Sequence, residues 1–497
     1  MPGMPVAPRA AWLFACLSTA CVRHEAHRWD PDNPGESGVR APARLDAARE
    51  CARPIAGQRA DVHLEACADA RGELFRVGYV EIDDQGRAWD LQQMHGMLAF
   101  MDAAHDDGAL VVVFVHGWRH DAGVDDSNVA DFRRVLYTLA RAERDAGTGR
   151  AVRGVYLGWR ARPFRTTPVL SFWARKKGAH RVGDRDGGLV IDHVGARIER
   201  WRAKEMHGGG ASRSRALIVG HSFGAAVVHS AIHRQLERRI LREATLPDGA
   251  EPGLAFDLVA LVNPAFEAGR LRPMYELSST QPADSDDTPA LLVVTTKADC
   301  NTDRHFRMGM SGIRGEGVYR DETEKQQRRT GAGHWPWPVR HEAEAIVCGE
   351  ASSTDPFSPD RVHFEGGEGD VEPTGAPPRA ASGERRRASG CRYVVHDHDT
   401  TCRFVPSAAV DPVVVVYDTE SELMDHHGDA FNSALWTFVW SVAGEVLRVP
   451  PPARESSPAP NVSPPTPNAP TRDDVTDPDP EATSTAADPP THLGERG

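Results

Sequence analysis

The sequence lacks two features that would point to particular classes of protein. Its 58 Lys and Arg residues are outnumbered by 71 Asp and Glu residues, and the formal net charge is −13. Because phosphate backbones are bound through an excess of basic side chains, we expect no nucleic-acid partner. The chain also has no Cys-x-x-Cys pair, the spacing typical of zinc and redox sites, so we expect no metal.

Long hydrophobic runs are also scarce, and the one near the N-terminus is too short to span a bilayer. Arg9 precedes this apolar run, residues 10–17, which ends in small residues as a short export signal does. Cys16 fits the short lipobox pattern of a bacterial lipoprotein better, whereas Cys21 leaves a more normal hydrophobic length. We interpret residues 1–21 as a leader with Cys21 as the favoured lipidation candidate. The predicted location is the cell envelope, with membrane attachment through that cysteine.

The chain has eight cysteines, an even number that stays even when Cys16 and Cys21 are set aside. An even number suits an oxidising compartment. Proximity makes Cys51–Cys67 and Cys391–Cys402 the simplest disulfides, and other pairings stay open.

Strand-like and helix-like segments alternate along the middle of the chain. Residues 110–115 (LVVVFV) form an unbroken apolar run, which is typical of a strand buried on both faces of a parallel sheet. Amphipathic segments such as residues 128–146 separate it from later strand-like runs. These later runs are residues 153–159, 216–220, 256–265 and 290–296. The alternation predicts an α/β fold with a doubly wound, mostly parallel sheet.

Composition changes towards both ends of the chain. Residues 22–71 are polar and rich in Ala and Arg, and we interpret them as an N-terminal extension. Residues 72–449 are predicted to form the α/β domain, with a long irregular insertion at about 307–390 that is rich in Gly, Arg, Glu, Ser and Pro. Residues 450–497 are dominated by Pro, Ser, Thr, Asp and Ala, which predicts a disordered tail.

The pattern Gly-x-Ser-x-Gly occurs at residues 220–224, where a strand-like run meets a helical one. A nucleophile elbow holds its serine in a strained strand–turn–helix, and bulky flanking residues would clash there. The hydroxyl then lies at a helix N-terminus, whose N–H groups favour a developing anion. We therefore expect Ser222 to be a nucleophile, with Gly220 and Gly224 permitting the turn.

A serine hydroxyl is a poor nucleophile without a base, and the base needs an orienting acid. In the chain order Ser, acid, His, the acid follows a later strand. The loop after residues 290–296 contains Asp299, which we favour, and Asp303. The loop before the closing helical segment contains His426 and His427, and we favour His427 because it lies nearer that segment.

Acyl transfer also needs two N–H donors for the oxyanion. Phe223, directly after the serine, is expected to supply one. The loop after residues 110–115 begins His116-Gly117-Trp118, and we expect the Trp118 N–H to be the second. His116 precedes the serine in the chain and is expected to stabilise this loop rather than act as the base.

Two further patterns lie outside this set. Residues 396–399 (HDHD) look like part of a metal cluster, but the binuclear pattern is not completed, and we interpret them as a polar loop. Residues 333–338 (GHWPWP) form an aromatic patch within the predicted insertion. Two roles are open for this patch, lining an acyl pocket or anchoring the insertion on the core.

The segments VFVHGW, GHSFGA, TTKAD and HHGD, in this order, resemble the α/β-hydrolase superfamily and, more narrowly, exported or lipoprotein esterase-like hydrolases of bacteria. The resemblance covers about residues 72–305 and 390–448, and the long insertion departs from it. It implies cleavage of a small-molecule or lipid ester by a Ser–His–Asp triad through an acyl-enzyme, with no organic cofactor. The alternatives are a non-catalytic envelope or binding protein on this fold, and thioesterase or acyltransferase chemistry at the same residues.

Overall fold

The computed structural model describes most of the predicted domain. It describes residues 26–28, 43–45, 51, 63–102, 108–161, 168–207, 211–245, 255–279, 289–310, 318–337, 341–343, 396–397, 400–401, 413–418, 423–432, 435–436, 438–440 and 442–443. All of these lie in the first of two compact units, residues 1–450. The predicted leader, with Cys16 and Cys21, and the predicted tail lie outside the described residues.

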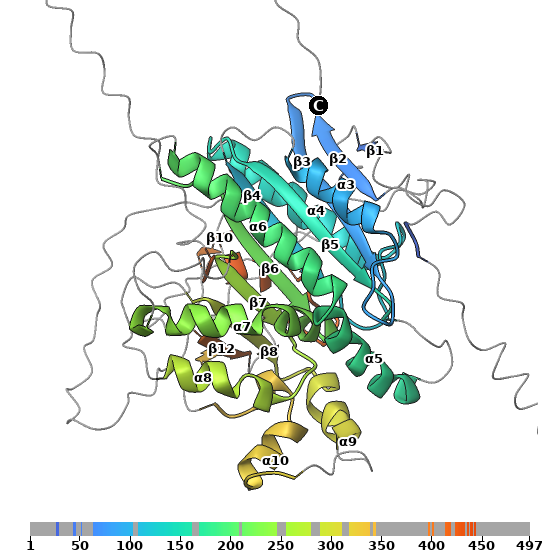
Figure 1. Ribbon diagram of the computed structural model, residues 1–497, viewed down its shortest axis with the longest axis vertical. Coiled ribbons are helices and arrows are strands. Elements are labelled where there is room, and N and C mark those ends of the chain that lie inside the picture. Colours follow the sequence, from blue (N-terminus) through green and yellow to red (C-terminus); the bar gives the residue numbers. More distant parts are fainter. Residues whose placement is uncertain are drawn as a thin grey trace, which may run out of the picture. The chain divides into compact units, whose positions relative to one another are not determined.

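A ten-stranded sheet forms the centre of this unit, in the order β1-β2-β3-β5-β4-β6-β7-β8-β12-β9 (Figure 1). Its strands are β1 (Ala43–Leu45), β2 (Leu64–Asp69), β3 (Gly72–Ile82), β4 (Ala109–Val115), β5 (Ala151–Trp159), β6 (Arg215–His221), β7 (Leu258–Val262), β8 (Leu291–Thr296), β9 (His341–Ala343) and β12 (Val413–Asp418). Neighbouring strands pair in parallel throughout, except that β2 is antiparallel to β3. The predicted mixed α/β fold with a mostly parallel sheet is confirmed.

Helices connect the strands. They are α3 (Leu91–Asp102), α4 (Ser127–Asp145), α5 (Pro168–Gly183), α6 (Asp186–His207), α7 (Phe223–Thr245), α8 (Arg272–Ser278), α9 (Phe306–Met310) and α10 (Glu322–Arg329), with the short helical turns η1 (Ala268–Arg270), η2 (Asn301–His305) and η3 (Ala332–His334). The described residues between 435 and 443 are also helical.

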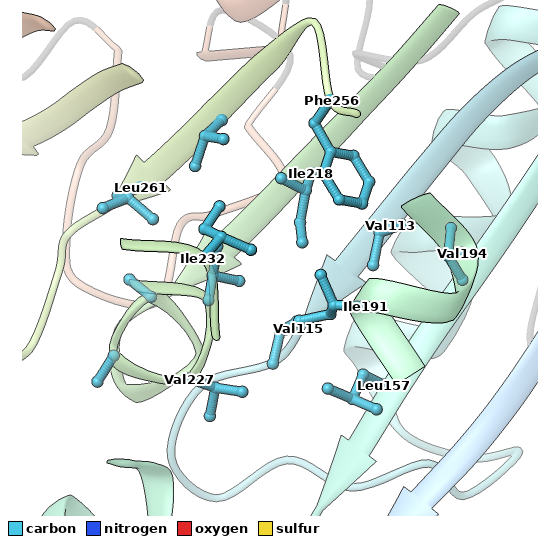
Figure 2. Packing of buried hydrophobic residues seen from close by; sticks show 14 of the residues in the cluster. Val113, Val115, Leu157, Ile191, Val194, Ile218, Val227, Ile232, Phe256 and Leu261 are labelled. Atoms are coloured by element: carbon cyan, nitrogen blue, oxygen red, sulfur yellow. The ribbon is translucent and has the colours of Figure 1, made fainter. Parts of the chain in front are cut away.

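Alternate residues of β4 face two separate cores, as the two-residue period of a strand requires. Val113 belongs to a core formed with α3, α6 and α7, whereas Phe114 belongs to a core formed with α4 and the helical residues 435–443. Figure 2 shows the first core, where Ile191 of α6 and Val227 of α7 pack over the sheet. Helices therefore cover both faces, and the carboxyl ends of the parallel strands are left for the loops that carry the predicted site residues.

The sheet begins earlier than the predicted domain start at residue 72. Strands β1 and β2 lie within residues 22–71, the predicted extension, and β2 pairs along β3. The buried side chain of Glu65 interrupts the apolar pattern of β2. Arg28 and Arg133 form ion pairs with this carboxylate, so a strand that looks polar in sequence is buried.

The segment predicted as an irregular insertion, residues 307 to 390, contains regular structure where it is described. Most of α9, together with α10, η3 and β9, lies within it, and β9 extends the sheet by pairing with β12. Residues 344–395 lie outside the described part. Within 318–337, the charged and glycine-rich composition concealed a short helix and a turn that dock on the core.

One predicted disulfide is confirmed. Cys51 is bonded to Cys67 of β2, with the two Cα atoms 5.7 Å apart. Cys391 and Cys402 lie outside the described residues, and Cys300 is an exposed free thiol. A disulfide is typical of oxidising compartments. Among the described helices, none combines the length and apolar character needed to cross a membrane.

Candidate active site

Ser222 lies in the turn between β6 and α7, with a backbone φ of +57°. This left-handed conformation costs a non-glycine residue about 1–3 kcal/mol and is found mainly at functional sites. Neighbouring backbone holds it in place: Ser222 N–H donates to the Val262 carbonyl (2.9 Å), and its own carbonyl accepts from Ala225 and Ala265 (both 3.1 Å). The turn is thus tied to both α7 and the end of β7.

The glycines on either side of Ser222 are required by the space around the turn. A Cβ at Gly220 would lie 2.7 Å from the Cα of Ala225 in α7. A Cβ at Gly224 would overlap the carbonyl oxygen of Val115, at the end of β4. Any larger residue at either position would push the serine turn away from the sheet.

The structure brings three of the predicted residues into one hydrogen-bonded chain. His427 Nε2 lies 2.8 Å from Ser222 Oγ, and His427 Nδ1 lies 2.8 Å from Asp299 Oδ2. Asp299 and Ser222 are buried, while the His427 side chain is 17% exposed. Solvent therefore reaches this chain at the imidazole.

The alternative residues have other surroundings. Asp303 lies in η2 and forms an ion pair with Arg307, 3.1 Å away. His426 is exposed. The structure thus separates both alternatives from the contacts made by Asp299 and His427.

The carboxylate of Asp299 is held by several donors. Its Oδ1 accepts the backbone N–H groups of Asn301 (2.9 Å) and Thr302 (3.0 Å). Burial alone would raise the pKa of Asp299, but the hydrogen bonds and charge of His427 and the bonds from Thr302 lower it to about 2. An ionised carboxylate only accepts, so His427 Nδ1 carries the proton. His427 Nε2 is then free to accept the proton of Ser222.

Two side chains hold the backbone of His427. His221 Nε2 donates to the His427 carbonyl at 2.7 Å, and Asn263 Nδ2 lies 3.4 Å from the same oxygen. Burial and the nearby His427 lower the pKa of His221 to about 3, so this donor is a neutral imidazole. Asp418, at the end of β12, anchors the preceding turn by accepting the N–H of Leu423 at 2.9 Å.

The loop after β4 lies against the serine turn. A Cβ at Gly117 would lie 2.9 Å from the Cβ of Ser222. The neighbouring ring of Trp118 contacts that of Phe223 edge-on, with centroids 6.3 Å apart. Phe223 is the first residue of α7, and the first N–H groups of a helix have no partner within it. The backbone near both predicted oxyanion donors is therefore close to Ser222.

His116 stabilises this loop. Its Nδ1–H donates to the Gly117 carbonyl (2.9 Å), and its Nε2 accepts the backbone N–H of Trp159 (2.9 Å). Burial lowers the pKa of His116 to about 4. Both ring nitrogens are used within the loop and β5, away from the serine hydroxyl.

The two remaining sequence patterns differ in outcome. The backbone of residues 396–397 pairs with residues 400–401 as the short strands β10 and β11, but their side chains lie outside the described part. Among the described side chains, no group of three or more His, Cys, Asp or Glu is arranged to hold a metal ion. In the aromatic patch, the Trp337 ring is buried in the core and lies against that of Tyr275 of α8, with centroids 4.6 Å apart, which anchors this segment on the core.

Sequence reasoning missed several residues that surround the hydrogen-bonded Ser–His–Asp triad, namely His221, Asn263, Thr302, His334 and Asp418. Only Thr302 carries a local signal, because a residue three positions after an Asp is well placed to donate its backbone N–H to that side chain. The contacts of His221, Asn263 and His334 join residues that are distant in sequence, and no spacing rule indicates them.

The fold and site define a mixed α/β protein with a Ser–His–Asp hydrogen-bonded chain beside the carboxyl ends of a mostly parallel sheet. The sequence matches no family model, and no curated protein matches it. Among solved structures the chain is similar to the phospholipase PlaB from Legionella pneumophila in complex with thio-NAD, at 14% identity and a TM-score of 0.21. The match covers 42% of this chain and 41% of that one, so the chain spans less than half of that phospholipase.

Proposed function

We propose that the protein is a serine hydrolase that cleaves carboxylic esters, with Ser222 as nucleophile, His427 as general base and acid, and Asp299 as the acid that orients it. The observation that carries the proposal is the pair of 2.8 Å contacts that join these three side chains. The left-handed backbone of Ser222 supports it, because such strain recurs in nucleophile elbows. The elbow and the mostly parallel sheet favour an α/β-hydrolase fold.

The proposed reaction has two halves. Ser222 Oγ attacks the ester carbonyl while its proton moves to His427 Nε2, and the N–H groups of Trp118 and Phe223 stabilise the oxyanion. Collapse of this intermediate breaks the bond to the alcohol, which leaves with the proton from His427. Water then attacks the acyl-enzyme with His427 as base, and the acid product and free Ser222 are released.

The expected substrate is a small-molecule or lipid ester. Trp118 and Phe172 are half-buried aromatic residues next to Phe223, and the rings of Phe172 and Phe223 have centroids 5.5 Å apart. Apolar side chains beside the nucleophile favour an apolar acyl group. We retain the export and the acylation of Cys21 as parts of the proposal, which would bring the enzyme to a membrane surface.

Hydrolysis of p-nitrophenyl esters of several acyl chain lengths tests this proposal. We expect Ser222→Ala to lose activity by about 10⁴- to 10⁶-fold, as in other serine hydrolases. Ser230→Ala is a matched control, because Ser230 Oγ lies 2.8 Å from the ring of His180 in a second buried Ser–His pair. Wild-type rates in Ser222→Ala, or equal losses in both variants, would contradict the proposal.

The same residues serve thioester hydrolysis and transfer to acceptors other than water. Turnover of matched ester, thioester and amide substrates separates these chemistries. A non-catalytic protein on this fold would hydrolyse none of them, and a fluorophosphonate probe would leave Ser222 unlabelled.

A further inference from the structure

The carboxylate of Asp299 has a second side-chain partner on the oxygen that contacts His427. Thr302 Oγ1 makes a hydrogen bond to Asp299 Oδ2, and the same hydroxyl lies 2.8 Å from His334 Nε2. His334 comes from η3, in the segment that the sequence predicts to be an irregular insertion. The Ser222–His427–Asp299 chain therefore continues through Thr302 to a second buried imidazole.

The direction of these hydrogen bonds follows from the donors available. An ionised Asp299 accepts only, so the single proton of the Thr302 hydroxyl must point at its carboxylate. The hydroxyl oxygen can then only accept from His334, which must carry its proton on Nε2. The imidazole of His334 thereby fixes the hydroxyl in the one rotamer that donates to Asp299.

His334 is rigidly supported. The Thr330 carbonyl accepts from Ala268 N–H, and the Phe266 carbonyl accepts from Ala332 N–H, both at 2.9 Å. A Cβ at Gly333 would overlap the hydroxyl of Thr295, so the segment packs directly on β8. His334 itself is buried, and its ring meets Tyr417 of β12 edge-on.

We propose that Thr302 and His334 form a positioning pair that acts through Asp299 to set the orientation and the basicity of His427. This inference rests on the proposed function, because it assigns roles within the same site. The pair occupies one side of the carboxylate oxygen that binds His427 Nδ1 and limits the negative charge available to the imidazole. Neither residue touches Ser222 in this arrangement.

Removing the Thr302 hydroxyl has two expected effects. Among the described residues, Thr302→Val leaves Asp299 Oδ2 with His427 as its remaining side-chain donor, so the carboxylate is less firmly oriented. A hydrogen bond to a charged group is worth roughly a 10- to 100-fold effect, which we expect as a loss in kcat/KM. The freed negative charge stabilises the imidazolium form of His427, so the acid limb of the kcat/KM profile should move to higher pH.

Several charged and titratable groups surround the pair. Asp299, Asp303, Arg307 and His427 act on His334, and His221 faces His427 with ring centroids 5.2 Å apart. Thr302→Val neither adds nor removes any of these ionisable groups. A shift of the acid limb in that variant therefore reports the lost hydroxyl.

Two conservative variants and one matched control complete the test. Thr302→Ser keeps the hydroxyl and should restore the wild-type profile, and His334→Gln keeps an N–H donor and should exceed His334→Ala in rate. Thr138→Val makes the same change at a buried threonine of α4 whose hydroxyl has no hydrogen-bond partner among the described residues. We expect wild-type rates and pH profile in Thr138→Val.

NMR titration of the His427 ring in ¹³C-histidine-labelled protein measures its protonation without turnover. The resonance is assigned by its loss in His427→Asn. A higher midpoint in Thr302→Val than in wild type supports the positioning pair even where no ester is cleaved, so failure of the proposed function remains distinguishable. Unchanged midpoint and rates in Thr302→Val would overturn the inference, as would equal changes in Thr138→Val.

Discussion

Asp299 and Glu65 are both buried carboxylates, and both have a pKa of about 2. Burial would raise each pKa, but their partners reverse this in different ways. The pKa of Glu65 is lowered by the guanidinium groups of Arg28 and Arg133 and by hydrogen bonds from Arg133 and Tyr79. The pKa of Asp299 is lowered by an imidazole, a hydroxyl and backbone N–H groups.

The difference separates a structural network from a reactive one. The charged partners of Glu65 are arginines, whose guanidinium groups stay charged across the accessible pH range, so the charges of this cluster are fixed. It joins the N-terminal segment to the sheet, because Arg28 Nη1 contacts Glu65 at 2.9 Å and Arg28 N–H donates to Glu81 at 2.8 Å. In the proposed reaction His427, the partner of Asp299, takes the proton of Ser222, so the charge of this network changes during turnover.

The largest expected effect is on catalysis. Asp299→Asn should lower kcat by about 10⁴-fold, because an amide in place of the carboxylate stabilises the wrong tautomer of the histidine. Glu65→Gln should leave kcat per folded molecule unchanged. Ester hydrolysis with folded protein quantified by circular dichroism measures both. A comparable loss of kcat in both variants would remove the distinction between the two networks.

Stability should show the reverse order. Glu65→Gln removes the carboxylate that Arg28 and Arg133 both contact, and breaking a buried ion pair in this way costs about 3–5 kcal/mol of unfolding free energy. Glu276→Gln, in α8, is the control, since its 61% exposed carboxylate makes an ion pair with Arg272 that is worth about 1 kcal/mol or less. Urea unfolding measures both changes. Equal losses of unfolding free energy in the two variants would mean that the buried ion pairs of Glu65 stabilise the fold no more than an exposed pair does.

The disulfide reinforces the same structural region, because Cys67 and Glu65 share β2. The Cys51–Cys67 bond spans 16 residues of sequence, and closing a loop of this size is worth about 3 kcal/mol. We expect the double variant Cys51→Ser, Cys67→Ser to unfold at a lower urea concentration with unchanged kcat. Reductant should lower the wild-type midpoint to that of the variant, and a midpoint insensitive to reductant would contradict this.

The same two regions explain what the sequence predicts and what it does not. Residues 110–115 and the Gly-x-Ser-x-Gly turn are local patterns, so the mostly parallel sheet and a serine turn at its edge can be predicted. The strand that contains Glu65 cannot, because its burial depends on arginines distant in the chain. Likewise His426 and His427 occupy the same loop, and only long-range contacts to Ser222 and Asp299 separate them.

The smallest expected effect concerns the pH dependence of stability. His221 is buried and neutral, with a pKa of about 3, whereas an unfolded histidine titrates near about 6.5. Between these values the unfolded state binds more protons, so stability falls as the pH is lowered, by about 2 kcal/mol for this residue between about pH 7.5 and pH 5. His221→Asn should remove that part of the loss in urea unfolding. Glu65→Gln should keep it, because the pKa of Glu65 lies below this range, and identical pH slopes in both variants would refute the assignment.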